Sequence, residues 1–252
     1  MEKRIALVTG ATSGIGEATA RLLAANNFKL ILCGRRQDRL AQISKELSEL
    51  TEVTSLTFDV SQQRAVEQSI NSLPMAWKEI DVLINNAGNA HGLSPIQTGD
   101  LNDWEKMIDI NVKGLLHVSR EVMNGMIERK RGHIVNIGSI AGLEVYPNGN
   151  VYCASKSAVD SITKGMRFDL NPYGIKVTSI NPGMVDTEFS LVRFKGDAER
   201  AKNTYKGMQP LTAVDIAELI LFTVTRPAHV VLADVLVLPV AQASATVVKR
   251  DA

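Results

Sequence analysis

Residues 9–16 read TGATSGIG, a glycine-rich stretch between the apolar run RIALVT (4–9) and the helical pattern GEATARLLAANN (16–27). Glycine clusters alone are a weak signal, but this one lies between an expected strand and an expected helix. Glycines allow a tight turn and leave room for a pyrophosphate beside the N–H groups that open a helix. The stretch therefore predicts a strand–turn–helix unit that binds a dinucleotide, although a plain glycine turn is the alternative.

The rest of the chain alternates short runs rich in Val, Ile and Leu with helical patterns. Such runs are typical of strands that are buried on both faces of a parallel sheet. We therefore expect a single α/β domain over residues 1–252, a doubly wound Rossmann fold whose parallel seven-stranded sheet has helices on both faces. The expected strands are 4–9, 28–33, 53–58, 81–85, 132–138, 175–181 and 234–239, and the expected helices are 16–27, 38–50, 61–73, 101–129, 151–170, 198–206 and 213–225.

Residues 183–212 form a long stretch without an obvious strand. They combine charged residues with Phe189, Phe194 and Tyr205. Ligands of doubly wound sheets bind beyond the carboxyl ends of the strands, and long insertions in such places are usually functional. We expect a substrate lid at about residues 186–212.

The composition is that of an ordinary globular protein. Of 252 residues, 45% are hydrophobic and 22% are charged, which are usual values for a globular domain. The 28 Lys and Arg residues nearly balance the 27 Asp and Glu residues, and a net charge of +1 provides no field that attracts nucleic acid or an acidic membrane. We expect a small-molecule substrate and neither of those partners.

The sequence shows no sign of a membrane anchor, a disulfide framework or a metal site. No apolar run approaches the roughly 20 residues that cross a bilayer, and IALV (5–8) is too short for a signal-peptide core. Two cysteines, Cys33 and Cys153, favour a reducing compartment. The four histidines lack metal-ligand spacing. We expect a cytoplasmic protein without a metal.

The end of the second expected strand indicates which dinucleotide is bound. An acidic residue there would accept a hydrogen bond from the ribose 2′-hydroxyl of NAD, but this chain has Arg35 and Arg36 after Gly34. Guanidinium groups favour a 2′-phosphate, and the Ser13 hydroxyl could donate to the same phosphate. We predict NADP, with a solvated surface charge as the alternative for Arg36.

Two further features point to a site at the same edge of the sheet. Asp59 and Val60 follow the third expected strand, where an adenine ring would lie, although a helix N-cap is an equal interpretation of Asp59. Tyr152 and Lys156 are four residues apart, so they share one helix face. An ammonium beside a phenol lowers the pKa of the phenol and improves it as an acid/base, but a surface pair is the alternative for an isolated Tyr-x-x-x-Lys.

Over essentially its whole length the chain resembles the short-chain dehydrogenase/reductase family. The resemblance rests on motifs in register: TGATSGIG (9–16), DV (59–60), NNAG (85–88), Asn111, GS (138–139), Tyr152-x-x-x-Lys156 and Pro182-Gly183 with Thr187. It implies that Tyr152 is the catalytic acid/base and that Lys156 also holds the nicotinamide ribose. It implies further that Ser139 hydrogen-bonds the substrate oxygen and that Asn111 holds a water of the proton relay.

The same resemblance implies a cofactor-binding set that spans most of the chain. Thr187 matches the hydroxyl that meets the nicotinamide carboxamide, and the small residues of NNAG would lie against the adenosine and ribose. The full set is Gly10, Thr12, Ser13, Gly14, Ile15, Gly16, Arg35, Arg36, Asp59, Val60, Asn86, Ala87, Gly88, Tyr152, Lys156, Pro182, Gly183, Val185 and Thr187.

The segments 186–207 and 227–244 resemble the NADP-dependent 3-hydroxy acid dehydrogenase branch. This implies serine, allo-threonine or 3-hydroxyisobutyrate-type substrates, with Ser139 and Tyr152 in contact with the substrate. A small anionic substrate also needs a cation near the pocket. Arg193 is our candidate for the carboxylate, and a lid salt bridge or a surface role is the alternative. A general carbonyl or 3-oxoacyl reductase, and more remotely a non-catalytic NADP-sensing module, remain alternative functions.

Relatives in this family are commonly tetramers, so we expect a homotetramer. The apolar tail at 235–248 is consistent with an interface, although cover by the chain's own sheet would give the same pattern.

Overall fold

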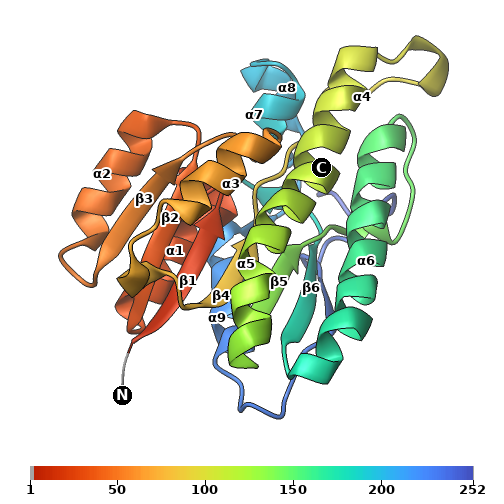
Figure 1. The fold of residues 1–252 in the computed structure, drawn as a ribbon. Coiled ribbons are helices and arrows are strands. Elements are labelled where there is room, and N and C mark those ends of the chain that lie inside the picture. The colour runs from red at the N-terminus through yellow and green to blue at the C-terminus, as the bar shows by residue number, and fades with distance from the viewer. Residues whose placement is uncertain (1–2, 252) are drawn as a thin grey trace.

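The computed structural model describes residues 3–251, and its centre is a parallel sheet (Figure 1). Seven strands of this part of the chain lie in the order β3-β2-β1-β4-β5-β6-β9, and all neighbouring pairs are parallel. Ala6, Leu7 and Val8 of β1 are completely buried, as expected for a strand that is covered on both faces. The strands are β1 (Arg4–Thr9), β2 (Phe28–Gly34), β3 (Val53–Thr57), β4 (Ile80–Asn85), β5 (His133–Ile137), β6 (Lys176–Pro182) and β9 (Asp234–Val237).

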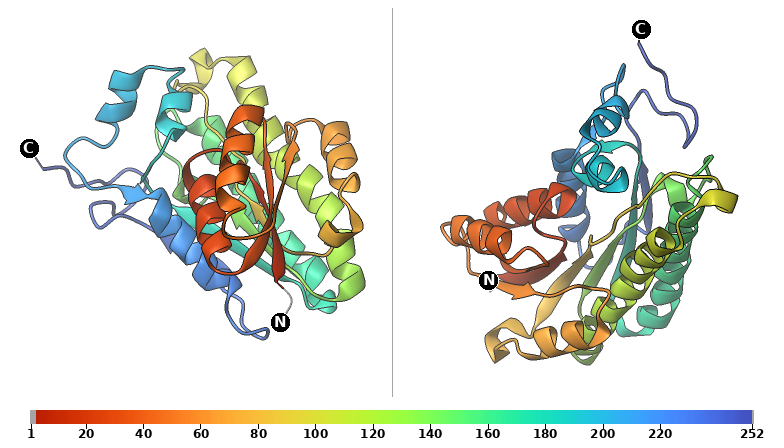
Figure 2. Two further views of the ribbon diagram at one scale, coloured as in Figure 1. Left: turned by 90° about the vertical axis from the view of Figure 1, so that its left-hand side faces the viewer. Right: turned by 90° about the horizontal axis from the view of Figure 1, so that it is seen from above.

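Helices cover both faces of the sheet and give three layers (Figures 1 and 2). One face packs against α3, α5 and α6, where Val118 and Val122 of α5 contribute to the core. The other packs against α1, α2 and α9 through residues such as Leu23 and Leu40. These helices are α1 (Gly14–Ala25), α2 (Gln37–Leu47), α3 (Gln63–Asn71), α5 (Leu115–Arg129), α6 (Asn150–Leu170) and α9 (Ala213–Val224).

The carboxyl ends of the strands carry the loops that matter for function. The strand order reverses between β1 and β4, and ligands of open α/β sheets bind at such a reversal. The glycine-rich loop follows β1 at this point, and residues 86–88 follow β4. The short helices α7 (Phe189–Arg193) and α8 (Ala198–Asn203) stand at this end, opposite the N-terminus in Figure 1.

The predicted fold class is confirmed, and element boundaries differ from the predictions by a few residues. Helix α1 ends where Asn27 adopts a left-handed conformation, with φ 67°, so the Asn-Asn pair does stop the helix. The helix expected at 198–206 ends at Asn203. None of the helices in residues 3–251 has the length and apolar character needed to span a membrane.

The prediction of one continuous helix over 101–129 is wrong. The chain forms α4 (Leu101–Ile108), a π-helical stretch (Asp109–Gly114) and then α5. The widened turn contains Asn111, whose side chain hydrogen-bonds to the backbone of Asn89 instead of facing solvent. Such π-helical insertions often occur at functional sites, and helical periodicity in a sequence does not reveal them.

The expectation that residues 183–212 lack a strand also needs correction. The two-residue strands β7 (Val185–Asp186) and β8 (Leu211–Thr212) pair in parallel and tie the two ends of this segment together. Thr212 then opens α9 in a capping box with Asp215, which stabilises the helix start. The segment is therefore anchored at both ends beside the sheet.

Candidate active site

The glycine-rich loop makes a tight turn because its backbone requires glycine. Gly10 and Gly14 have φ of 65° and 52°, values that L-residues with side chains rarely adopt. A Cβ at Gly16 would lie 2.3 Å from the carbonyl oxygen of Gly10 and 2.5 Å from Nδ2 of Asn86. Ser13 precedes α1 and its hydroxyl makes no capping hydrogen bond, so this hydroxyl remains available to a ligand.

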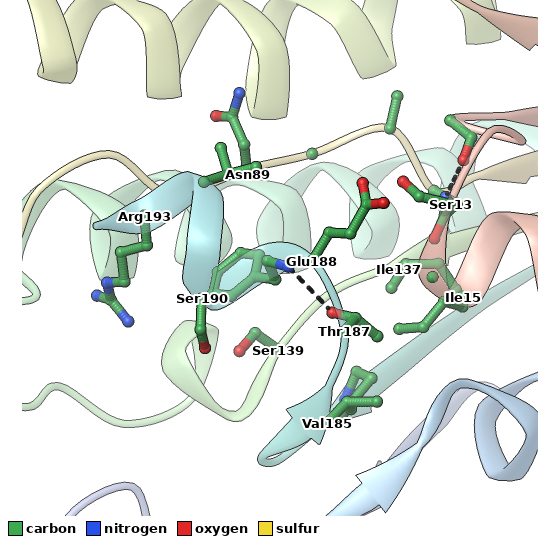
Figure 3. Close-up of a pocket in the computed structure, with 18 of the residues that line it drawn as sticks. Ser13, Ile15, Asn89, Ile137, Ser139, Val185, Thr187, Glu188, Ser190 and Arg193 are labelled. Atoms are coloured by element: carbon green, nitrogen blue, oxygen red, sulfur yellow. Dashed lines mark hydrogen bonds between the residues drawn. The ribbon is translucent and has the colours of Figure 1, made fainter. Parts of the chain in front are cut away.

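One cavity of about 500 Å³ lies at the carboxyl ends of the strands. It is lined by all residues predicted to bind the cofactor except Gly16, and also by Ser139 and Arg193. Gly16 does not line the cavity, and it packs closely against the Gly10 carbonyl and Asn86 within the loop, so its role toward the cofactor stays a prediction. Figure 3 shows Ser13 and Arg193 at opposite ends of the pocket, with Ser139 nearer to Arg193.

The end of the cavity beside Ser13 is rich in cations. Arg36 donates from Nε and Nη2 to Oγ1 of Thr12, at 3.1 and 3.0 Å. Arg36 is thus fixed to the glycine-rich loop and is not simply a solvated surface charge. Arg35 is more exposed and pairs with Asp59 at 3.4 Å.

Asp59 is not the N-cap of α3, because that helix begins four residues later, at Gln63. Its carboxylate accepts hydrogen bonds from the backbone N–H and the hydroxyl of Ser61, at 2.9 and 2.8 Å. Burial alone would raise the pKa of Asp59, but these bonds and the charge of Arg35 lower it overall. Asp59 is therefore ionised and turned toward the arginine end of the cavity.

Tyr152 lies at the other end, on the first turn of α6, and only 8% of it is exposed. The ring of Phe189 packs against its ring at 5.5 Å between centroids. Ser139, which ends the loop after β5, accepts a hydrogen bond from Ala141 N–H at 3.1 Å. Burial raises the pKa of Tyr152, Tyr146 raises it further, and hydrogen bonding with Ser139 and the charge of Arg193 only partly offset this rise.

The expectation that Lys156 lowers the pKa of Tyr152 is not met in this structure. The Lys156 ammonium donates to the carbonyl of Ile137 at 2.8 Å, and burial is the largest influence on the Tyr152 pKa and raises it. Burial lowers the pKa of Lys156 itself to about 8. The spacing places both groups at one site, but burial dominates the proton affinity of each.

Asn111 lies behind the cavity wall. Its Oδ1 accepts from Asn89 N–H at 2.8 Å, and its Nδ2 donates to Asn89 O at 2.8 Å and to Ser155 Oγ at 3.0 Å. A Cβ at Gly88 would lie 3.2 Å from Asn111 Oδ1 and 3.4 Å from Lys156 Nζ. The amide and the ammonium therefore face the same point beside Gly88.

Arg193, at the end of α7, lies over the end of the cavity that contains Tyr152 and Ser139. Its guanidinium is 5.3 Å from the ring centroid of Tyr152 and 5.4 Å from that of Tyr146. Nη2 donates to the Tyr146 hydroxyl at 2.5 Å. Within residues 3–251 no carboxylate lies at salt-bridge distance from Arg193. The alternative of a lid salt bridge is therefore not supported.

Several residues of the site carry no recognisable motif in the sequence. Tyr146 holds Arg193, and Glu188 faces the arginines at the opposite end. Gln242, from the C-terminal tail, accepts from Met184 N–H at 2.8 Å, and a Cβ at Gly183 would lie 2.2 Å from its Oε1. Only the folding of distant segments onto the cavity reveals these residues.

The described residues fit a bound dinucleotide and do not form a metal site. In residues 3–251 no three His, Cys, Asp or Glu side chains are grouped so that they could hold a metal ion. Cys153 is buried and unpaired beside Tyr152, as expected for a packing residue. The left-handed glycines, the unpaired N–H groups that open α1 and the arginines at one end fit a dinucleotide with a 2′-phosphate.

A doubly wound sheet with a glycine loop at its reversal point and a buried Tyr–Lys pair in the same cavity defines a nucleotide-dependent oxidoreductase. The chain belongs to the short-chain dehydrogenase family, whose profile, described as "short chain dehydrogenase", matches residues 4–197. The predicted family is thereby confirmed.

Three comparisons place the chain within this family. It is 48% identical over 242 residues to an NADP-dependent 3-hydroxy acid dehydrogenase of Salmonella typhi, across 96% of this chain and 97% of that protein. It is 46% identical to sulfoacetaldehyde reductase 2 of Chromohalobacter salexigens, across 98% of this chain and 99% of that one. A structure described as the closed form of serine dehydrogenase complexed with NADP⁺ superposes with a TM-score of 0.92 at 43% identity, across 98% and 100% of the two chains.

Proposed function

We propose that the protein catalyses the NADP-dependent interconversion of small 3-hydroxy acids of the serine, allo-threonine or 3-hydroxyisobutyrate type and their 3-oxo acids. When bound, NADP supplies the acceptor for the hydride that leaves C3, and NADPH returns it. The observation that carries the substrate class is the guanidinium of Arg193, which lies over Tyr152 without a carboxylate partner in residues 3–251. The names of the relatives at 48% and 43% identity support the same class.

Tyr152 is the proposed acid/base. Its phenol is buried at the cavity wall beside Ser139, so the Ser139 hydroxyl and the phenol can contact one substrate oxygen together. Ser139 stabilises the charge that develops on this oxygen, while Tyr152 takes up the hydroxyl proton during oxidation and returns it during reduction. Because burial raises the Tyr152 pKa, the phenol needs cationic neighbours to lose its proton near neutrality.

Lys156 and Asn111 are proposed to carry the proton onward. Burial lowers the pKa of Lys156 to about 8, so the ammonium gives up a proton more easily than an exposed lysine does. Its Nζ and the Asn111 amide face the same point beside Gly88, where a water could join them. The same ammonium is proposed to hold the nicotinamide ribose.

Arg193 is proposed to bind the substrate carboxylate. A guanidinium and a carboxylate form paired, charge-assisted hydrogen bonds, each worth roughly 1.5–3 kcal/mol. Tyr146 supports this role because its hydroxyl fixes the position of Nη2 at 2.5 Å. The substrate anion would neutralise a cation that the chain itself leaves without a counter-charge.

The cofactor set named above is proposed to hold NADP along the cavity. The pyrophosphate would lie at the loop 10–16 and the helix start, and the 2′-phosphate at Ser13, Arg35 and Arg36. The lining at the nicotinamide end includes Pro182, Gly183, Val185 and Thr187, while Asp59 and Val60 line the adenine end. The prediction of NADP from two arginines agrees with the relatives named above.

Residues 186–212 are proposed to act as a lid over this cavity. Gly92 N–H donates to the carbonyl of Arg193 at 3.0 Å, and Lys195 pairs with the buried carboxylate of Asp103 at 2.8 Å. The fold superposes on the closed serine dehydrogenase with a TM-score of 0.92 and on another serine dehydrogenase structure, from Escherichia coli, with 0.81. The contacts with Gly92 and Asp103 support a lid that lies over the cavity.

A substrate panel with matched variants tests the proposal. The panel contains L-serine, L-allo-threonine, 3-hydroxyisobutyrate, an uncharged alcohol, a diketone and an acyl-thioester, each with NADP or NADPH. Arg193→Ala should raise KM about 10- to 100-fold for the 3-hydroxy acids, as expected for the loss of a charge-assisted bond, and leave the uncharged alcohol nearly unaffected. Arg200→Ala, which removes a cation from α8 outside the cavity, is the control.

Two outcomes would contradict the proposal. Equal effects of Arg193→Ala on charged and uncharged substrates would remove the carboxylate role of Arg193. Faster turnover of the thioester or the diketone than of any 3-hydroxy acid would favour a general carbonyl or 3-oxoacyl reductase instead. Loss of turnover in Tyr152→Phe would exclude a non-catalytic NADP sensor.

A second substrate class is favoured by the same cation. A sulfonate, like a carboxylate, is a singly charged oxyanion that a guanidinium can hold, and one relative at 46% identity is a sulfoacetaldehyde reductase. Reduction of small sulfonated aldehydes with NADPH is therefore the second candidate. The ratio of kcat/KM for sulfoacetaldehyde to that for a 3-oxo acid decides between the two.

We also propose a cytoplasmic homotetramer. Both cysteines in the chain are unpaired and buried, which suits a reducing compartment. Leu236 of β9 is 47% exposed and Val240 is fully exposed, so the C-terminal segment presents apolar surface that a second copy could cover. Mass photometry would measure the number of subunits, and a monomer at micromolar concentration would contradict the proposal.

A further inference from the structure

Glu188 is an acidic residue at the arginine-rich end of the cavity. It precedes α7, lines the cavity, and pairs with Nη1 of Arg36 at 3.0 Å and with Nη1 of Arg39 at 2.8 Å. Figure 3 shows its carboxylate pointing into the pocket on the side where Ser13 lies. Burial alone would raise the Glu188 pKa, but the bonds from the two arginines outweigh this and lower it. Glu188 is therefore an anion beside the proposed 2′-phosphate site.

Arg36 does not depend on Glu188 alone for its position. Arg36 makes two hydrogen bonds to the Thr12 hydroxyl and one, at 3.1 Å, to the Thr12 carbonyl. Arg39 also reaches that carbonyl, at 3.5 Å. Because the glycine-rich loop already holds the Arg36 guanidinium, the carboxylate occupies donors that a phosphate could use.

The charges at this end of the cavity imply that Glu188 weakens the binding of a 2′-phosphate. Among residues 3–251, three arginines at this end pair with two carboxylates, those of Asp59 and Glu188. A phosphate that approaches Arg36 must share its donors with Glu188 or displace it, and it also experiences the repulsion of a like charge. NAD carries a hydroxyl in place of that phosphate and does not compete for these donors.

We propose that Glu188 competes with the 2′-phosphate of NADP for Arg36 and Arg39, and thereby limits the affinity for NADP and hastens the release of NADPH. This inference rests on the proposed use of NADP. Glu188 is thus a residue that sets cofactor specificity from within the lid, 152 residues from Arg36 in the chain. Release of product often limits turnover in well-evolved enzymes, so a weaker hold on the cofactor has a functional use.

Binding measurements with Glu188→Gln test the inference. Titration calorimetry would give Kd for NADP, NAD and adenosine 2′,5′-bisphosphate in the wild type, in Glu188→Gln and in Glu199→Gln. The last variant removes an exposed carboxylate of α8 and is the control for charge. Kd for NADP and the bisphosphate should fall about 2- to 10-fold in Glu188→Gln, as expected for half-exposed ion pairs, while Kd for NAD stays constant.

Release and salt dependence provide two further readouts. Stopped-flow dissociation of NADPH should slow by the same factor in Glu188→Gln. The gain in affinity should shrink at about 0.5 M salt, because exposed charges are then screened.

Each other outcome would overturn the inference. A weaker affinity for NADP in Glu188→Gln would show that Glu188 positions the arginines, and an equal change for NAD and NADP would show that it acts on the lid as a whole. An unchanged Kd for NADP would mean that Glu188 does not compete. A wild type that does not distinguish NADP from NAD would refute the cofactor proposal itself, which is a separate result.

Discussion

Replacement of Lys156 by methionine should change the pH dependence of stability in a way that can be calculated from the structure. Lys156 is 7% exposed, and its ammonium has one protein partner among the described residues, the carbonyl of Ile137. Burial lowers its pKa from 10.5 to about 8. Methionine keeps a similar stem and removes the charge.

The direction in which stability changes with pH depends on whether the folded or the unfolded state holds the Lys156 proton more tightly. Between pH 8 and 10.5 the unfolded chain keeps its Lys156 proton while the folded chain releases it, so the stability of the wild type rises with pH across this window. At about 1.4 kcal/mol per pKa unit, burying the charge costs roughly 3 kcal/mol at pH 7. About 2 kcal/mol of this cost should disappear by pH 9.5, and Lys156→Met should show no such change.

The hydrogen bond to Ile137 changes the difference in free energy of unfolding between wild type and Lys156→Met by a constant amount. It does not change how this difference depends on pH. Its loss in Lys156→Met costs roughly 1 kcal/mol at any pH. Burial raises the pKa of the Cys33 thiol, so ionisation of Cys33 lowers stability as pH rises above about 9. This effect is common to both proteins and cancels in their difference.

Urea unfolding at fixed protein concentration, followed by the fluorescence of Trp77 and Trp104, provides the measurement. The free energy of unfolding of Lys156→Met minus that of the wild type should be about 2 kcal/mol more positive at pH 7 than at pH 9.5. A difference that stays constant within about 0.5 kcal/mol would show that Lys156 is not buried as a charge.

Three other predictions concern the site and its surroundings. Tyr152→Phe should retain the fold and the affinity for NADPH while kcat falls about 10²- to 10⁴-fold. Steady-state kinetics with a parallel NADPH titration measure both quantities. A fall in kcat of less than about 10-fold would contradict the proposed role of the phenol. Gly16→Ala should weaken NADP binding at least about 10-fold and lower the melting temperature, because the new Cβ would lie 2.3 Å from the Gly10 carbonyl oxygen. The control Gly165→Ala should do neither, because a Cβ at Gly165 would enter open space. Cys33 and Cys153 are buried, so a thiol reagent should label neither cysteine in the folded protein and both in urea; rapid labelling of the folded protein would contradict their burial.

The parts of the site that depend on short spacings could be predicted from the sequence. The glycine-rich loop, the pair Tyr152 and Lys156, and the arginines after β2 are each close together in the chain, and local geometry places their members side by side. Alternating apolar runs and helical periodicity were sufficient for the seven strands of the main sheet and the helices between them, but not for the π-helical break at 109–114 or for β7 and β8. All of these signals are local.

Contacts between distant segments could not be predicted in this way. Glu188 meets Arg36 across 152 residues, and Tyr146 meets Arg193 across 47. The π-helical turn at Asn111 depends on a hydrogen bond to Asn89, which periodicity does not encode. The pKa of Tyr152 was predicted with the wrong sign for this structure, because spacing reveals a neighbouring ammonium but not how deeply the phenol is buried.

Two cations that have no carboxylate partner in the described part of the chain lie beside Tyr152, an arrangement that costs stability but serves ligand binding. Lys156 lies on one side of Tyr152 in α6, and Arg193 lies over its ring, while neither has a carboxylate partner within residues 3–251. Pairing either cation with a chain carboxylate would remove a desolvation cost, but it would also occupy the donors that the substrate and the ribose need. The unpaired cations therefore lower the stability of the free protein, and binding of an anionic substrate with a dinucleotide should recover that stability by mass action.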